Sequence, residues 1–203
     1  GESAGALSIA TLLAMPRAED LFRRAILQSG GGQHATGANT AARIGRHLAE
    51  TMGVPPDRAR IAAEPLDRLL AAQGALRAEV EAGPDPARWG EVALTGLPWQ
   101  PVIDDDTLPG PPLDRVRAGA GAGVDLLVGS NTQETRLFLV AAGAMDKISP
   151  QAVQAQTAAY GLPPDTGLAA YRDLHPWASA GELLSALQTD WYWRIPALNL
   201  AEA

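Results

Sequence analysis

The chain has 203 residues, of which 46% are hydrophobic and 19% charged, so it can build a packed core and is not of a disordered composition. Its formal net charge of −7 argues against nucleic acid and anionic membranes as partners, because both bind clustered positive charge. The absence of cysteine excludes disulfides, thiolate nucleophiles and cysteine-ligated metal sites.

Targeting segments are also missing from the sequence. No apolar run approaches the roughly 20 residues that span a bilayer, and no signal peptide is visible at the start. The chain opens on Gly1 rather than on methionine, so we expect its true start to lie further upstream. A cytoplasmic and a secreted location both stay open.

Helices alternate with short apolar runs along the first half of the chain. The run before Pro16 is apolar and short-chained, which favours a buried helix, and the run before the glycines at 30–32 is typical of a buried strand. Four elements are expected here in chain order: a helix over 4–14, a strand over 24–28, a helix over 40–52 and a helix over 66–80.

The second half continues the same alternation. Its clearest strand is 124–129, which is apolar, brief and bounded by glycines. Five helices surround it in chain order, over 113–118, 132–142, 149–160, 165–174 and from 179 onward.

Strands separated by helices predict an α/β fold with a mostly parallel sheet and flanking helices. We expect one domain over 1–203, with the chemistry-bearing part over 1–143 and a helical region over 144–203. The chain begins inside a motif and ends inside an expected helix, so we expect this fold to be incomplete at both ends.

The first five residues, Gly1-Glu2-Ser3-Ala4-Gly5, match the pattern G-x-S-x-G of a nucleophile elbow. In such an elbow a sharp turn from strand to helix pushes the serine hydroxyl out at the top of a sheet. The positions two residues away on either side must be small, because larger side chains would collide. By itself the match is weak evidence. In a chain rich in glycine and alanine, the same five residues could equally well form a plain turn before a buried helix.

Five segments in the same order resemble those of type-B carboxylesterases and cholinesterase-like proteins, and they extend over nearly the whole chain. They are Gly-Glu-Ser-Ala-Gly-Ala at 1–6, the run from Leu21 to Gly30, Pro101-Val102-Ile103-Asp104 with the following Leu108-Pro109, the run from Leu126 to Glu134, and Arg194-Ile195-Pro196-Ala197. Agreement at five ordered places is far more specific than the elbow alone. The resemblance implies a partial α/β-hydrolase fold and a serine esterase that forms an acyl-enzyme.

The resemblance also assigns roles to individual residues. Ser3 would be the nucleophile, and the backbone N–H of Ala4 would donate one hydrogen bond to the oxyanion. Glu134 would be the acid that orients a histidine and stabilises its imidazolium. Ser29 would hydrogen-bond this acid, and Glu2 would support the nucleophile from the adjoining position.

Simpler explanations exist for several of these residues. Glu134 could be a first-turn carboxylate that the helix dipole favours, and Ser29 could be an ordinary turn residue beside its glycines. Three adjacent carboxylates at 104–106 cannot all point at one ion, so a solvated turn is expected there and no metal site. The aromatics at 191–193 could line an acyl pocket, but aromatics on a helix usually belong to the core.

None of the three histidines matches the family's catalytic histidine, which the resemblance places after the last residue of this chain. His47 and His175 are expected to be structural or exposed, and His34, just after the glycines, is the one expected nearest the site. The His-Gly-Gly-Gly loop of the family would lie before Gly1. We therefore expect this chain alone to be nearly inactive.

The expected partner is a small carboxylic ester, with no cofactor, nucleic acid or membrane. Apolar surface left uncovered by missing strands would favour self-association. Two other hypotheses stay open: a non-catalytic cholinesterase-like binding or adhesion module, and a degenerate remnant. Retention of both Ser3 and Glu134 speaks against the first of these.

Overall fold

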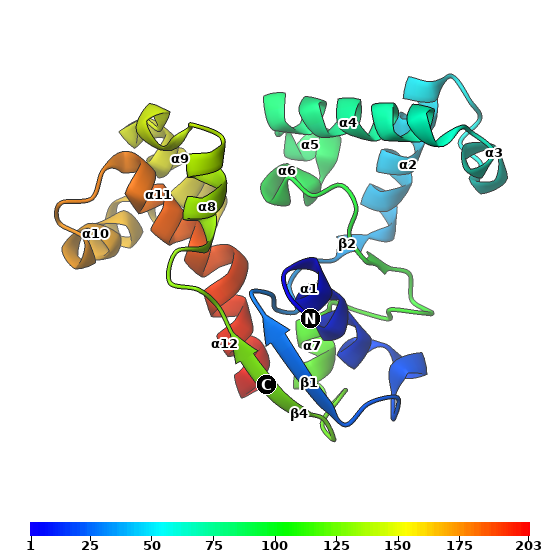
Figure 1. The fold of residues 1–203 in the computed structure, drawn as a ribbon, viewed down its shortest axis with the longest axis horizontal. Coiled ribbons are helices and arrows are strands. Elements are labelled where there is room, and N and C mark those ends of the chain that lie inside the picture. Colours follow the sequence, from blue (N-terminus) through cyan, green and yellow to red (C-terminus); the bar gives the residue numbers. More distant parts are fainter. The chain divides into compact units, whose positions relative to one another are not determined.

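The computed structural model describes residues 1–203, which form two compact units (Figure 1). Unit 1 comprises Gly1–Gln33 and Pro111–Ala203, and unit 2 comprises His34–Gly110. The single domain over 1–203, with its division near residue 143, stays a prediction. No helix combines the length and the apolar character that crossing a bilayer requires.

Unit 1 holds two strands of a parallel sheet and most of the helices. In chain order its elements are α1 (Ala4–Ala14), the 3₁₀ turn η1 (Pro16–Ala18), β1 (Arg24–Gln28), α7 (Pro112–Arg117), β4 (Asp125–Gly129), α8 (Glu134–Ala141), η2 (Met145–Lys147), α9 (Pro150–Ala159), α10 (Pro164–Leu174), α11 (Ala180–Thr189), the π-helical segment η3 (Asp190–Arg194) and α12 (Ile195–Glu202). Apart from the short turns, η3 and α12, each of these helices and strands begins within two residues of the place that the sequence pattern predicts. η3 and α12 continue the helix expected from 179 onward.

The sheet of unit 1 joins three stretches of backbone that run in the same direction. β1 and β4 pair in parallel, from Arg24 opposite Asp125 to Gln28 opposite Gly129. On the other side of β1, the Gln28 N–H donates to the Gly1 carbonyl at 3.0 Å, and the Ser3 N–H donates to the Gln28 carbonyl at 2.9 Å. The carboxyl ends of all three stretches therefore meet at one edge of the sheet.

One face of this sheet is packed against helices. Ala25 and Leu27 of β1 lie in a cluster with buried residues of α1 and α12, and apolar residues of α7 border the cluster. The alternate positions point to the other face, where Ile26 is 53% and Leu127 65% exposed. The prediction of a buried strand over 24–28 is thus wrong at its alternate positions, because helices of this chain cover only one side.

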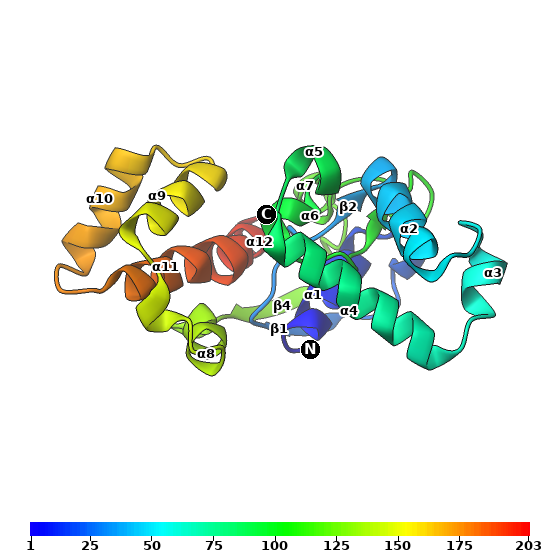
Figure 2. The same ribbon diagram turned by 90° about the horizontal axis from the view of Figure 1, so that it is seen from above.

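The helices α9, α10 and α11 form a second apolar cluster in unit 1, built on Val153, Leu168, Leu183, Leu184 and Leu187. α9 begins at Ser149, whose hydroxyl accepts the Ala152 N–H, and α11 begins at a capping box between Ser179 and Glu182. Figure 2 shows α11 running on through η3 into α12. This continuous rod extends from the helical cluster to β4, which α12 contacts.

Unit 2 is built mainly from helices. Its elements are β2 (Thr36–Gly37), α2 (Ala38–Met52), α3 (Arg58–Ala62), α4 (Leu66–Ala82), α5 (Pro86–Trp89), α6 (Val92–Thr95) and β3 (Val102–Ile103). β2 and β3 pair in parallel, and Gly53 ends α2 in the left-handed conformation that its position predicts. The short elements β2, α3, α5, α6 and β3 have too little periodicity to be predicted from the sequence.

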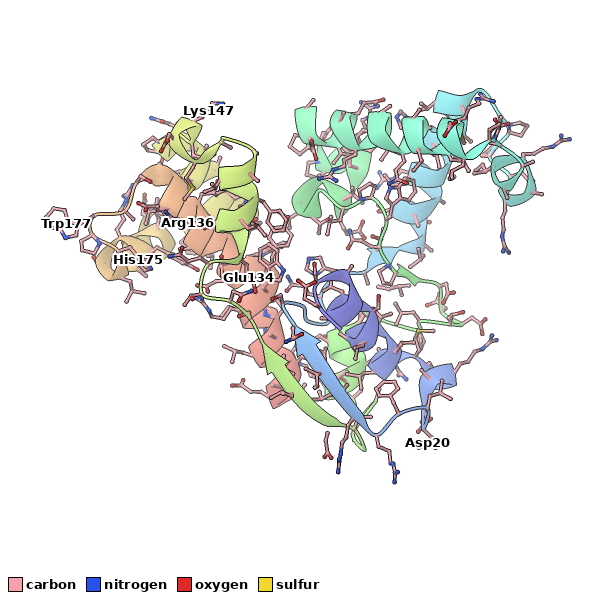
Figure 3. All side chains as sticks on the ribbon, in the orientation of Figure 1. Asp20, Glu134, Arg136, Lys147, His175 and Trp177 are labelled. Atoms are coloured by element: carbon pink, nitrogen blue, oxygen red, sulfur yellow. The ribbon has the colours of Figure 1, made fainter.

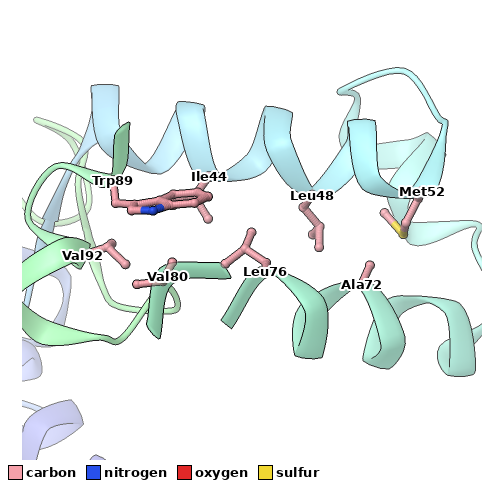
Figure 4. Packing of buried hydrophobic residues seen from close by; sticks show 8 residues of the cluster. All are labelled: Ile44, Leu48, Met52, Ala72, Leu76, Val80, Trp89 and Val92. Atoms are coloured by element: carbon pink, nitrogen blue, oxygen red, sulfur yellow. The ribbon is translucent and has the colours of Figure 1, made fainter. Parts of the chain in front are cut away.

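The core of unit 2 lies between α2 and α4 (Figure 4). Its apolar side chains are Ile44, Leu48, Met52, Ala72, Leu76, Val80, Trp89 and Val92. The indole N–H of Trp89 donates to the Gly83 carbonyl at 3.0 Å, so this large buried ring leaves no polar group unpaired. His47 packs edge-on against the same ring, at 5.2 Å between centroids, which gives it the structural role expected of it.

Replacing Leu76 by alanine should destabilise the protein by about 2–5 kcal/mol, because this fully buried side chain would leave a cavity. Leu70→Ala on the same helix is the matched control, since Leu70 is 54% exposed and its loss should cost less than about 0.5 kcal/mol. Urea unfolding followed by circular dichroism measures both. Equal losses in the two variants would contradict the assignment of the core.

Candidate active site

Ser3 has a backbone conformation that a residue with a side chain seldom adopts. Its φ is 50° and its ψ −119°, at the junction between the stretch paired with β1 and the first residue of α1. Such a conformation is strained for a non-glycine residue and persists only where surrounding contacts impose it. The contacts are present: the Ser3 N–H donates to Gln28, and the Ser3 carbonyl accepts the Leu7 N–H at 3.0 Å. The result is an exposed serine on a sharp strand-to-helix turn.

Glycines allow the tight packing around this turn. A Cβ added to Gly1 would lie 2.5 Å from the Gly5 carbonyl carbon, and one added to Gly30 would lie 2.8 Å from the Ala6 Cβ and 3.1 Å from the Ser3 carbonyl oxygen. A Cβ at Gly5 itself meets no atom within 4 Å. Gly1 must therefore be small, as expected, because the Gly5 backbone comes close to it. Gly5 itself has room for a side chain, so the expectation fails on that side of the serine.

Glu134 is the first residue of α8, five residues after β4 ends, and Figure 3 shows it beyond the tip of that strand. One carboxylate oxygen accepts the backbone N–H of Asn131 at 2.7 Å, and the other accepts the Asn131 side-chain amide at 3.1 Å. The same amide lies 3.4 Å from the hydroxyl of Ser29, which also hydrogen-bonds the carboxylate. The structure thus brings Ser29 and Glu134 together across the ends of β1 and β4.

The surroundings of Glu134 favour its ionised form. Partial burial by itself would raise the pKa of this carboxyl group, but hydrogen bonds from Ser29 and Asn131 and the positive charge of Arg194 outweigh it. The pKa of Glu134 consequently lies below its ordinary value of 4.5. A carboxylate at this position is therefore charged at neutral pH and able to accept a hydrogen bond from an imidazole.

The nucleophile candidate and the acid candidate lie at the same edge of the sheet. Ser3 follows the stretch paired with one side of β1, Ser29 follows β1 itself, and Glu134 follows β4 on the other side. As the first residue of α1, Ala4 presents a backbone N–H that the helix leaves unpaired, next to the serine. A hydroxyl, a backbone N–H that the helix leaves unpaired and an ionised carboxylate are thus gathered at the carboxyl ends of three parallel stretches.

Other residues singled out in the sequence lie elsewhere or act locally. Glu2 is exposed and takes part through its backbone, which pairs with Gln28 and whose carbonyl accepts the Gly5 N–H, so the supporting role of its side chain stays a prediction. Asp104 accepts the backbone N–H groups of residues 106–108, which makes the run at 104–106 a turn. His34 belongs to unit 2, where burial lowers its pKa to about 4, and its expected place near the site stays a prediction.

His175 caps the end of α10 and is exposed beside the exposed Trp177 (Figure 3). The partners of the Glu134 carboxylate are Ser29, Asn131 and the charge of Arg194, and no histidine is among them. The aromatics at 191–193 are half-buried in a cluster in which Trp191 stacks on Tyr160 at 4.2 Å and Trp193 on Phe138 at 6.2 Å. They pack with one another, as their place on a helical segment predicts.

Sequence reasoning did not single out two residues that act on the acid, Asn131 through hydrogen bonds and Arg194 through its charge. Asn131 lies inside a segment that the resemblance already contained, and an asparagine three residues before a helix-starting glutamate is a signal for local hydrogen bonding. Arg194 is 60 positions away from Glu134 in the sequence, and nothing in the local pattern connects the two.

The chain is similar to several known proteins. A family model described as the carboxylesterase family matches residues 1–163. The para-nitrobenzyl esterase of Bacillus subtilis (strain 168) is 37% identical over 141 residues, which are 68% of this chain and 26% of that protein. The acetylcholinesterase of Myxine glutinosa is 31% identical over 148 residues, which are 69% of this chain and 40% of that protein.

Solved structures of carboxylesterases have the same fold. The crystal structure of the Geobacillus stearothermophilus carboxylesterase EST55 at pH 6.2 superposes with a TM-score of 0.79 at 28% identity, over 99% of this chain and 39% of that one. A structure of a PNB esterase gives a TM-score of 0.72 at 30% identity, over 99% of this chain and 38% of that one. The chain thus spans less than half of the length of each of these relatives.

Replacing Gly30 by alanine should destabilise the protein by about 1–3 kcal/mol, because the new methyl group would collide with α1 at Ala6. Gly45→Ala is the control with the opposite sign. Gly45 lies in α2 with open space around it, so alanine there should stabilise the protein by about 0.5–1 kcal/mol. Urea unfolding measures both, and a stable Gly30→Ala variant would contradict the close approach of α1 to the end of β1.

The lowered pKa of Glu134 predicts how stability depends on pH. A carboxyl group whose folded-state pKa is depressed stabilises the fold above its unfolded-state pKa, and this contribution is lost as the pH falls through the folded-state value. The wild-type protein should therefore melt at a higher temperature than Glu134→Gln at about pH 6, and the difference should shrink below about pH 4. Thermal melts of both proteins over this range check it, and a constant difference would show that the pKa is not lowered.

Proposed function

Because the chain belongs to the carboxylesterase family, we propose that the protein containing it hydrolyses carboxylic esters through an acyl-enzyme on Ser3. The observation that carries this proposal is the strained backbone of Ser3 at the start of α1, at the same sheet edge as the ionised Glu134. A strained serine of this kind projects its hydroxyl from the sheet, where an ester carbonyl can reach it.

The proposed reaction proceeds in two steps. The Ser3 oxygen attacks the ester carbonyl carbon while its proton passes to a histidine, and the tetrahedral oxyanion accepts a hydrogen bond from the Ala4 N–H. Collapse of this intermediate expels the alcohol, which takes the proton from the histidine. Water then attacks the acyl-enzyme in the same way and releases the acid.

Glu134 would orient this histidine and stabilise its imidazolium. Its carboxylate is held by two neutral partners, Ser29 and Asn131, so its own position is determined before any imidazole binds. We infer that the triad histidine is not one of the three in this chain. His47 packs in the core of unit 2, His34 is buried in the same unit and His175 is exposed at the end of α10. None of the three is among the partners of Glu134.

The proposed substrate is a small carboxylic or aryl ester. Two relatives of this chain are described as a para-nitrobenzyl esterase and an acetylcholinesterase, and these descriptions apply to those proteins. The choice among esters belongs to parts of the protein that contact the acyl and alcohol groups. A non-catalytic binding module is the weaker proposal, since such a protein has no need for a strained serine beside a fixed carboxylate.

A fluorophosphonate probe should label Ser3 in the protein that carries this chain, and the modified residue can be mapped by peptide mass spectrometry. Ser3→Ala should abolish labelling and ester hydrolysis. Ser8→Ala is the matched control, because Ser8 is an exposed serine of the same helix whose hydroxyl bonds only the Ala4 carbonyl. Labelling of Ser8, or hydrolysis that survives Ser3→Ala, would refute the assignment.

Residues 1–203 expressed alone should hydrolyse p-nitrophenyl butyrate several orders of magnitude more slowly than the whole protein, because the serine would lack its histidine. The two rates are compared at equal concentrations of folded protein. Activity of the isolated chain that matches the whole protein, and disappears in Ser3→Ala, would show that the chain supplies its own base.

A further inference from the structure

The segment η3 (Asp190–Arg194) is a π-helical turn between α11 and α12. The Ile195 N–H donates to the Asp190 carbonyl, five residues back, instead of four. Single π-helical turns are uncommon and often lie at functional sites, because the extra residue per turn redirects the side chains around it. This turn contains Arg194, the charged residue that acts on Glu134.

Arg194 contacts the loop that precedes the acid. One nitrogen of its guanidinium donates to the Thr132 carbonyl at 3.0 Å, two residues before Glu134. Another pairs with the Asp190 carboxylate, whose second oxygen accepts the hydroxyl of Tyr171 at 2.9 Å. The guanidinium is thus fixed between a carboxylate anchored to α10 and the backbone of the acid loop.

A second contact holds the other side of the acid. The hydroxyl of Thr189, the last residue of α11, accepts the backbone N–H of Thr135 at 3.3 Å. Thr189 is fully buried and Thr135 is 5% exposed, so this bond is shielded from water. Thr132 and Thr135 flank Glu134, and they are bound from the two ends of the segment Thr189–Arg194.

The pairing of Arg194 with Asp190 also keeps its guanidinium from forming an ion pair with Glu134. A guanidinium free to form a two-pronged ion pair with Glu134 would occupy the oxygens that an imidazole needs. Here the hydrogen bonds to Glu134 come from Ser29 and Asn131, which are neutral, while the guanidinium acts on it only through its charge. The carboxylate is thereby kept ionised and still accessible to a histidine.

We propose that Arg194 and Thr189 are positioning residues for the esterase reaction: they clamp the backbone on both sides of Glu134 and so place its carboxylate for the triad histidine. This inference rests on the proposed function. Neither residue touches the substrate, and both act through the acid.

The test uses the protein that carries this chain and measures the rate of Ser3 labelling by a fluorophosphonate from about pH 5 to about pH 9. Arg194→Met should slow labelling about tenfold or more near neutral pH and move the acidic limb of the profile upward by about half a pH unit. Loss of a positive charge raises the pKa of both members of an acid–histidine pair. Arg194→Lys, which keeps the charge, should restore the limb although part of the rate loss remains.

Controls separate positioning from stability. Arg136→Met removes another arginine that is paired with a carboxylate, that of Glu182, and it should leave rate and profile within about twofold of wild type. Arg194→Met leaves the Asp190 carboxylate without its cation, so Asp190→Asn with Arg194→Met is measured too. This pair should recover the melting temperature and keep the shifted limb.

Thr189→Val tests the second contact independently. It removes the hydroxyl that accepts the Thr135 N–H without changing any charge, so labelling should slow while the acidic limb stays in place. Thr189→Ser should recover the wild-type rate. An unlabelled Ser3 in the wild-type protein would overturn the proposed function itself. A labelled wild type with an unshifted limb in both Arg194→Met proteins, or an unchanged rate in Thr189→Val, would overturn the positioning role and leave the esterase assignment standing.

Discussion

The close approach of α1 to the end of β1 is the constraint on which the site depends. Ser3 can hold a φ of 50° only because its N–H is bound by Gln28 and its carbonyl by Leu7, on either side of the turn. The approach in turn requires a glycine at Gly30, where a single methyl group would meet the helix. Strain at the serine is therefore balanced by strand pairing and by packing, both of which lie outside the five-residue motif.

The acid is held by a different kind of interaction. Its carboxylate is bound by neutral donors from its own loop and from the residue after β1, while Arg194, whose charge acts on it, is engaged by Asp190 and by the Thr132 carbonyl. The charge of Arg194 therefore favours the ionised form of Glu134, while the guanidinium does not occupy the carboxylate oxygens. The helical region after residue 144 thus contributes to the proposed chemistry through η3, although it contains none of the proposed triad residues.

Much of the local structure was predictable because it depends on short-range patterns. The helix over Ala4–Ala14 and the strand over Arg24–Gln28 have the predicted bounds, since an apolar run and a proline or a glycine turn mark their limits. The burial of only one face of β1 was not predictable from the sequence. Side chains along the strand alternate between buried and exposed because helices cover one face of the sheet and not the other. Short elements such as α5 and α6 depend on the packing of Trp89 and Val92 into the core of unit 2.

The sequence by itself supplied the candidate nucleophile through the steric pattern G-x-S-x-G, and it supplied the candidate acid and Ser29 through segments that resemble those of a known family. Only the tertiary structure decided what holds the acid. The bonds from Arg194 to Thr132 and from Thr135 to Thr189 join residues more than 50 positions apart. Contacts of this kind depend on how helices pack against one another in the folded chain, and the periodicity of the sequence does not reveal them.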